Sequence, residues 1–195
     1  ITAYRPILYL WDKRTLFIGS LEEYLDISTG AATLMFALDK PIRFVTDKMS
    51  SAVECRSLLL PAGTSVRIDI QGAVIANCTL DPLGVDFHVL KGQMRHCIGN
   101  AFYQLNDERQ YIKKLQAISS LPLDSYELLK SLTQILKPKH EDRADYFIEP
   151  RIERVIGIIQ GTISENLSLS DLESAANLSP SRLTELFKQQ TGLPI

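Results

Sequence analysis

The side chains best suited to specific chemistry lie near the end of the 195-residue chain, on a helix predicted to begin at Pro180. Leu183, Leu186 and Phe187 share one face of that helix, so polar side chains occupy the other. Arg and Lys can donate hydrogen bonds to phosphates and guanine, hydroxyls can bind either, and a carboxylate can accept from cytosine N4. The candidate DNA-contacting residues are Ser179, Ser181, Arg182, Thr184, Glu185 and Lys188.

A shorter helix is predicted just before this one. Ser168 or Ser170 can cap it, and Ser170 with Glu173 has the spacing of a capping box. Asn177 is predicted to close it in the left-handed conformation, and Ser179 to cap the next helix. Two helices joined so tightly predict a helix-turn-helix or, as the alternative, an ordinary helical hairpin. The residues expected to face inward are Leu169, Leu172, Ala175 and Ala176.

This stretch resembles the first helix-turn-helix of an AraC/XylS-type transcription regulator. The resemblance is at the level of motifs and covers residues 151–195. Two positions depart from the family pattern: Glu173 stands where a small residue is usual, and Glu185 where a basic residue often reads DNA. The matching residues are Leu167-Ser168-Leu169, Asp171-Leu172, Ala176, Leu178-Ser179-Pro180-Ser181, Leu183, Leu186-Phe187-Lys188 and Thr191-Gly192.

The resemblance implies more than the motif itself. Family members often carry an N-terminal cupin-like barrel followed by helices that dimerise, and an effector bound by the barrel alters how the DNA-reading modules are presented. The resemblance also implies a second helix-turn-helix, which does not appear before Ile195, so we expect the sequence to be truncated after the first. The implied partners are promoter DNA, a small-molecule effector, a second copy of the chain and RNA polymerase.

Residues 7–90 consist of short apolar stretches separated by turn residues, which predicts an all-β unit. The clearest strand is 65–71, where Val66, Ile68 and Ile70 alternate with polar residues. Residues 9–11 and 15–18 flank a predicted hairpin turn. So many short strands favour a jelly-roll barrel. We therefore predict an α+β protein with a cupin-like barrel, then helices, then an all-α helix-turn-helix subdomain.

The spacing of apolar residues changes to three or four after residue 92, which predicts helices. The block from Ile98 to Leu105 is included in this helical segment, as is a leucine-rich helix bounded by Pro122 and Pro138. That helix could pack on the barrel or form a dimer seam, for which the candidates are Leu128, Leu132 and Ile135. The predicted domains are a barrel at 1–90, a helical dimerisation segment at 91–138, a linker at 139–149 and the helix-turn-helix half-domain at 150–195.

The formal net charge of −2 lacks the basic excess usual in nucleic-acid binders. Residues 140–195 hold five basic and nine acidic side chains, a charge of −4, so the acidity concentrates around the predicted motif. Because affinity for DNA comes largely from Lys and Arg that neutralise phosphates, this part alone should bind DNA weakly.

The remaining chemistry-bearing residues do not assemble a catalytic pattern. His88, His96 and His140 lack the spacing of a metal site, and Cys55, Cys78 and Cys97 read as free, mostly buried thiols of a reducing compartment. We therefore expect no enzyme activity, no cofactor and no metal. No apolar run is long enough to span a bilayer, so we expect a cytoplasmic protein without a membrane partner.

Three functions follow from the sequence. The first is a bacterial transcription regulator whose promoter binding is modulated by an effector in the barrel, at residues that the sequence does not identify. The second is a ligand- or partner-sensing cupin-like module that does not touch DNA. The third is a metal-dependent cupin enzyme.

Overall fold

The computed structural model describes residues 6–11, 13–21, 24–47, 49–81, 86–120, 126, 130, 148–162 and 167–195. The chain divides into two compact units, Ile1–Arg143 and Ala144–Ile195. The boundary falls within the linker predicted at 139–149.

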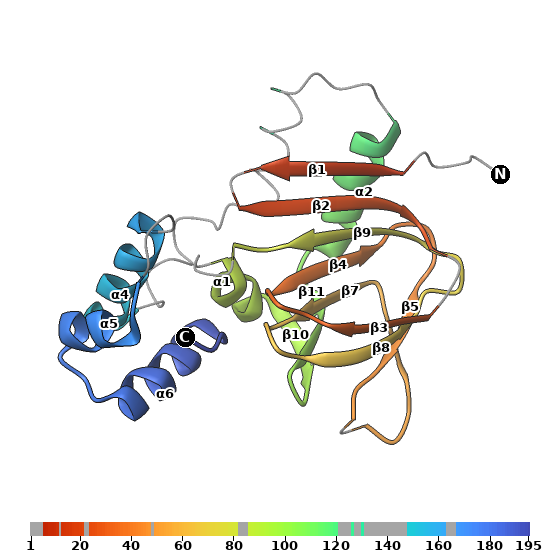
Figure 1. Ribbon diagram of the computed structural model, residues 1–195. Helices are drawn as coiled ribbons and strands as arrows, with labels where there is room; N and C mark the ends of the chain where they lie inside the picture. Colours follow the sequence, from red (N-terminus) through yellow and green to blue (C-terminus); the bar gives the residue numbers. More distant parts are fainter. Residues whose placement is uncertain are drawn as a thin grey trace. The chain divides into compact units, whose positions relative to one another are not determined.

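The described residues of the first unit form two antiparallel sheets (Figure 1). The strands of the larger sheet follow the order β1-β2-β9-β4-β7-β11-β10, and those of the smaller sheet the order β3-β8-β5-β6. The class predicted from sequence, α+β with a strand-rich N-terminal part, is confirmed. The strands are β1 (Ile7–Trp11), β2 (Arg14–Ser20), β3 (Tyr24–Ser28), β4 (Thr33–Ala37), β5 (Ile42–Val45), β6 (Val53–Cys55), β7 (Ser57–Leu60), β8 (Ser65–Asp69), β9 (Val74–Thr79), β10 (Met94–Ile98) and β11 (Ala101–Leu105).

The hairpin predicted between residues 9–11 and 15–18 is confirmed. β1 and β2 pair antiparallel around Lys13, whose φ of 63° lets the chain reverse within two residues. The turn that contains Gly63, at φ 75°, connects β7 of the larger sheet to β8 of the smaller sheet. A side chain at that φ would be strained, which explains why glycine stands there.

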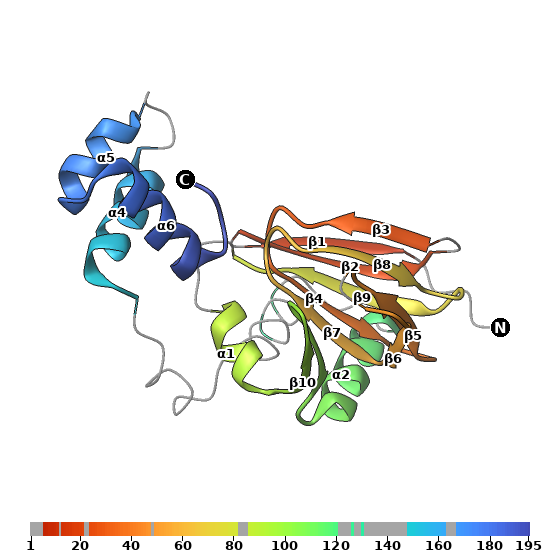
Figure 2. The ribbon, with the colours of Figure 1, turned by 90° about the horizontal axis from the view of Figure 1, so that it is seen from below.

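The larger sheet is covered on both faces. Its side chains toward the smaller sheet, among them Met35 and Leu58, form one core with Phe44 and Ile68 of that sheet. Its opposite face packs against α1 (Asp86–Gly92) and α2 (Glu108–Ser120) in a second core that includes Phe36. Figure 2 shows α2 beside the strands of the larger sheet. The helical spacing predicted after residue 92 is confirmed in α2, where Ile112, Leu115 and Ile118 are buried.

The helical segment predicted at 91–138 is wrong over residues 94–105, which form the hairpin of β10 and β11. The barrel predicted to end at residue 90 therefore continues in this hairpin, because β11 pairs with β7 in the larger sheet. Gln104 explains the misleading spacing, since its positive φ of 61° interrupts the alternation of faces. Phe102 and Leu105, three residues apart, consequently reach the same core, as they would on a helix.

Leu128, Leu132 and Ile135, the residues predicted to dimerise, lie outside the described residues. No helix in the described part of the chain is both long enough and apolar enough to cross a membrane.

The second unit contains three helices within its described ranges, 148–162 and 167–195. They share a small core whose buried side chains come from every helix. The helices are α4 (Pro150–Gly161), α5 (Leu169–Ala176) and α6 (Pro180–Thr191), and the buried residues are Ile152, Val155, Ile156, Leu172, Ala176, Leu183, Leu186 and Phe187.

Candidate nucleic-acid interface

The start of α5 is fixed by a capping box between Ser168 and Asp171. The Ser168 hydroxyl accepts from the backbone N–H of Asp171 at 3.3 Å, and the Asp171 carboxylate accepts from the backbone N–H of Ser168 at 3.0 Å. The box predicted from Ser170 and Glu173 is therefore wrong, and the alternative cap Ser168 is correct. The Ser168 hydroxyl also donates to the Asp171 carboxylate, and these hydrogen bonds hold the pKa of Asp171 below its ordinary value.

The turn between α5 and α6 consists of residues 177–179. Asn177 adopts the predicted left-handed conformation, with φ 52° and ψ 48°, and Leu178 N–H donates to the carbonyl oxygen of Glu173 at 3.2 Å. Two of the four side chains expected inward, Leu172 and Ala176, are buried. Leu169 is wrongly predicted inward because, as the first residue of α5, it extends beyond the small core and is 43% exposed.

Two contacts that sequence patterns did not predict hold α4 to the other helices. Arg154 of α4 donates to the carbonyl oxygen of Ala175 in the last turn of α5, at 3.0 Å. The backbone N–H of Glu149, the N-cap of α4, donates to the side-chain oxygen of Gln190 in α6, at 3.2 Å. Both bonds join residues more than 20 positions apart, so no local spacing could have indicated them. They position the turn and α6 relative to α4.

The start of α6 agrees with the sequence prediction in part. Ser179 is the N-cap and Pro180 the first helical residue, as predicted, but the Ser179 side chain makes no capping hydrogen bond. The first turn is closed through the backbone instead, where Leu183 N–H donates to the Ser179 carbonyl oxygen at 2.8 Å. The exposed Ser179 hydroxyl is therefore not committed to the helix end.

The six candidate residues lie on the exposed side of α6 or at its N-cap, opposite the buried Leu183, Leu186 and Phe187. Thr184 donates its hydroxyl hydrogen to the carbonyl oxygen of Pro180 at 2.9 Å, so its methyl group is the part left for a ligand. The structure thus brings together on one surface Ser179, Ser181, Arg182, Thr184, Glu185 and Lys188.

An ion pair runs along this surface. Arg182 Nη1 lies 2.7 Å from Glu185 Oε2, and both side chains are about half exposed, at 53% and 55%. The other carboxylate oxygen, Oε1, accepts a long hydrogen bond of 3.5 Å from the Gln189 amide. The predicted outward direction of Glu185 is therefore realised, with Arg182 and Gln189 as its helix neighbours.

Among the described residues of the second unit, Lys188 is a cation for which the structure shows neither an ion pair nor a side-chain hydrogen bond. Arg151 is paired with Glu149 at 2.5 Å, which lowers the pKa of the Glu149 carboxyl, while Arg154 and Arg182 have the partners given above. No described residue forms an ion pair with Lys188. A phosphate near α6 would therefore meet one uncompensated positive charge and one neutralised one.

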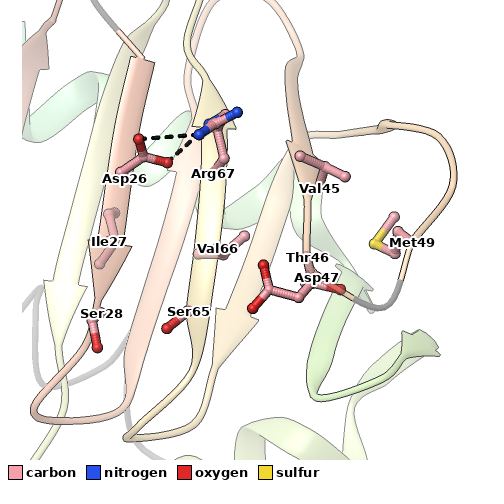
Figure 3. A pocket seen from close by; sticks show the side chains of 10 residues that line it. All are labelled: Asp26, Ile27, Ser28, Val45, Thr46, Asp47, Met49, Ser65, Val66 and Arg67. Atoms are coloured by element: carbon pink, nitrogen blue, oxygen red, sulfur yellow. Dashed lines mark hydrogen bonds and ion pairs between the residues drawn. The ribbon is translucent and has the colours of Figure 1, made fainter.

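The first unit has a cleft where β5 diverges from β8 (Figure 3). It has a volume of about 390 Å³ and combines apolar with charged and hydroxyl-bearing side chains. The Thr46 hydroxyl oxygen is buried and has no hydrogen-bond partner among the described residues. Asp26 and Arg67 form an ion pair across β3 and β8 at 2.9 Å. The other lining residues are Ile27, Ser28, Val45, Asp47, Met49, Ser65 and Val66.

The candidate metal ligands are not brought together. His96 stacks on Tyr103 with ring centroids 5.1 Å apart, and His88 lies edge-on to Phe87 at 5.3 Å. His140 lies outside the described residues. Within the described ranges, no group of three or more His, Cys, Asp or Glu side chains could hold a metal ion.

No protein-family model and no curated protein matches the chain. Among solved structures, the chain is similar to ToxT of Vibrio cholerae, an AraC-family regulator, at 9% identity and a TM-score of 0.46, over 100% of this chain and 78% of that one. It is also similar to a cupin superfamily protein of Desulfitobacterium hafniense at 17% identity and a TM-score of 0.32, over 39% and 75% of the two chains. A protein from Neisseria meningitidis matches at 10% identity and a TM-score of 0.35, over 41% and 87%. At these TM-scores, the likenesses indicate nothing about the activity of this chain.

Proposed function

We propose that this chain belongs to a DNA-binding transcription regulator in which α6 enters the major groove as the reading helix of a helix-turn-helix. The observation that carries the proposal is the three-residue turn at 177–179, together with six exposed polar residues at the N-cap and on the exposed side of the following helix. Hydroxyl, guanidinium, carboxylate and ammonium groups in one row supply the donors and acceptors that base edges and phosphates require.

The contacts around α6 support this assignment. A reading helix has to hold its side chains in a fixed register, and Arg154 and Gln190 tie α5 and α6 to α4 at 3.0 and 3.2 Å. The buried side of α6 is filled by leucine and phenylalanine, so the polar side is the one available to a ligand. The motif resemblance described from the sequence points to the same helix.

The experiment is binding of the protein to a double-stranded DNA site enriched from a random-sequence library, measured by fluorescence anisotropy at several salt concentrations. Lys188→Ala is expected to weaken binding several-fold and to reduce the slope of log affinity against log salt by about one. Lys114→Ala is the matched control, since it removes another exposed lysine, from α2 of the first unit. Equal effects of the two substitutions would exclude α6 as the DNA-contacting surface.

A module that binds a protein or ligand without DNA is the second candidate. Its support is electrostatic, because residues 140–195 carry a charge of −4 and Arg182 is neutralised by Glu185. Under this alternative no DNA sequence would be enriched, and Lys188→Ala would change nothing in the anisotropy assay.

Regulation by a small-molecule effector completes the proposal, and the cleft between β5 and β8 is its candidate site. The cleft volume lies in the range of small-molecule sites, and Thr46 offers a buried hydroxyl that lacks a partner among the described residues.

We further propose a cytoplasmic homodimer that contacts RNA polymerase at the promoter, with Leu128, Leu132 and Ile135 at the dimer seam. Leu132→Glu should then give a monomer in sedimentation, and an intact dimer would place that leucine elsewhere.

A further inference from the structure

We propose that Arg182 and Glu185 act as one sequence-reading unit that selects a G·C pair, with the guanidinium on guanine and the carboxylate on cytosine. The inference rests on the proposed function, because it assumes that α6 faces DNA bases. It adds the identity of the base pair and separates the residues that give sequence preference from the residue that gives affinity.

The geometry of the pair is the first argument. Arg182 uses Nη1 for the 2.7 Å contact with Glu185 Oε2, and a guanidinium has five N–H groups in a rigid fork. The hydrogen bond to Glu185 orients the Arg182 guanidinium, and most of the N–H donors of the guanidinium remain available for a ligand. Gln189 approaches the other oxygen, Oε1, at 3.5 Å, so Glu185 is held between residues three positions before and four positions after it. The two groups are oriented before any ligand arrives.

The chemistry of base edges selects the target. In the major groove guanine presents two acceptors, N7 and O6, which suit the Arg182 fork, and cytosine presents the N4 donor, which suits the Glu185 carboxylate. The same carboxylate would repel the acceptor-only edge of a guanine or a nearby phosphate. A positive and a negative group fixed side by side therefore match a base pair that presents acceptors next to a donor.

The net charge of the Arg182–Glu185 pair indicates that affinity for DNA comes from another residue, Lys188. The pair as a whole is neutral, so it neutralises no phosphate and should contribute little to the salt-dependent part of DNA binding. Lys188, one helical turn further and without an ion-pair partner among the described residues, carries the charge that a phosphate would meet. Sequence preference and affinity should consequently respond to different substitutions on the same helix.

The test compares three variants of the protein in selection from a random-sequence duplex library, followed by anisotropy on the selected duplex and on an unrelated duplex of equal length. The double variant R182A/E185A should lose about tenfold in preference for the selected duplex at an unchanged salt slope. K188A should keep the preference and lose about one unit of slope. E185Q should bind the unrelated duplex several-fold more tightly with a steeper slope, because Arg182 then regains its charge, and should relax the choice of cytosine.

Glu153→Gln is the matched control for E185Q, since it removes the same charge from an exposed position of α4. All the substitutions lie at exposed positions, so circular dichroism should show unchanged helix content. The inference is overturned if the double variant selects the same sequences as the unmodified protein, or if E153Q changes affinity and selection as E185Q does. If the unmodified protein enriches no sequence, the proposed function and this inference both fail.

Discussion

Arg14, at the start of β2, and Asp86, the first residue of α1, form an ion pair between positions 72 residues apart, with Arg14 Nε 2.6 Å from Asp86 Oδ2. Their side chains are only 16% and 7% exposed. The pair ties the first β-hairpin to α1, one of the two helices that pack against the larger sheet. Removing Asp86 would take one carboxylate partner away from the Arg14 guanidinium in a site with little access to water.

We therefore expect Asp86→Ala to lower the free energy of unfolding of the first unit by about 1.5–3 kcal/mol, the range for a hydrogen bond to a charged group, measured by urea denaturation. The comparison is Asp26→Ala, which breaks the exposed pair with Arg67 at 2.9 Å. An exposed pair contributes little to stability, so this second variant should unfold at nearly the same urea concentration as the original protein. Equal losses in the two variants would contradict the role given to burial.

The three cysteines should differ in reactivity. Burial raises the pKa of Cys55 to about 12 and that of Cys78 to about 12, whereas Cys97 is exposed in β10. Because the thiolate is the nucleophile and a raised pKa keeps the thiol protonated, both buried thiols should be inert at pH 8. Iodoacetamide should add one carbamidomethyl group per native chain, located at Cys97 by mass spectrometry. Three adducts in urea provide the control, and fast labelling of Cys55 in the native protein would contradict the burial.

The N-cap of α5 predicts how substitutions of two nearby serines, Ser168 and Ser170, change the stability of the second unit. Ser168→Ala removes the oxygen that accepts from the N–H of Asp171, and the loss of an N-cap of this kind costs about 1 kcal/mol. Ser170→Ala is the matched control, because that exposed serine lies inside α5 and its side chain caps nothing. Urea unfolding of the second unit, followed by helix circular dichroism, should separate the two variants. Equal midpoints would exclude the Ser168 cap.

The same cap predicts a pH dependence with a defined sign. Hydrogen bonds from Ser168 hold the pKa of Asp171 below 3.8, its ordinary value. A group whose pKa is lowered by folding contributes stability that is present above its unfolded pKa and is lost as the pH falls through the folded value. Unfolding midpoints of the second unit should therefore drop below about pH 4, and drop less in Ser168→Ala. An identical acid dependence in both proteins would show that the bond to Ser168 does not perturb Asp171.

The parts of the fold that follow local rules could be predicted from the sequence. Strand β8 alternates apolar and polar residues, α6 begins at Pro180, and Asn177 ends α5 in the left-handed conformation. Each of these features depends only on residues within a few positions in the sequence. The orientation of the six candidate residues followed from the apolar spacing of Leu183, Leu186 and Phe187 for the same reason. The spacing of apolar residues was sufficient to predict which side chains are buried wherever a strand or helix is regular.

The sequence predictions fail where the structure depends on the conformation of a single residue or on a contact between residues far apart in the chain. Gln104 takes a left-handed conformation that residues other than Gly, Asn and Asp rarely adopt. Because glutamine is not a residue expected there, the sequence did not predict the break in the alternation of β11. That break gives the apolar residues of β11 a spacing that resembles a helix. Arg154 and Gln190 bind backbone groups more than 20 positions away, and only the packed helices bring those partners near. The Arg182–Glu185 pair, in contrast, has helical i,i+3 spacing and could have been found from the sequence.

Asn177 connects the stability of the second unit with its proposed role. A residue with a Cβ is strained at φ 52°, although Asn tolerates this region better than most, so Asn177→Ala should destabilise the second unit by about 1 kcal/mol. Asn177→Gly should keep the turn, since glycine adopts a positive φ without steric cost. Thermal unfolding of both variants tests this order, and an alanine variant as stable as the glycine variant would contradict it.

The same two substitutions test whether the turn itself positions the reading helix. Asn177 is exposed and lies outside α6, so neither variant removes any of the six candidate DNA-contacting groups. If the left-handed turn sets the angle at which α6 leaves α5, Asn177→Ala should weaken DNA binding at a temperature where it is still folded, whereas Asn177→Gly should bind as the original protein does. Equal loss in both would mean that the Asn side chain contacts DNA, because glycine preserves the backbone but not the amide.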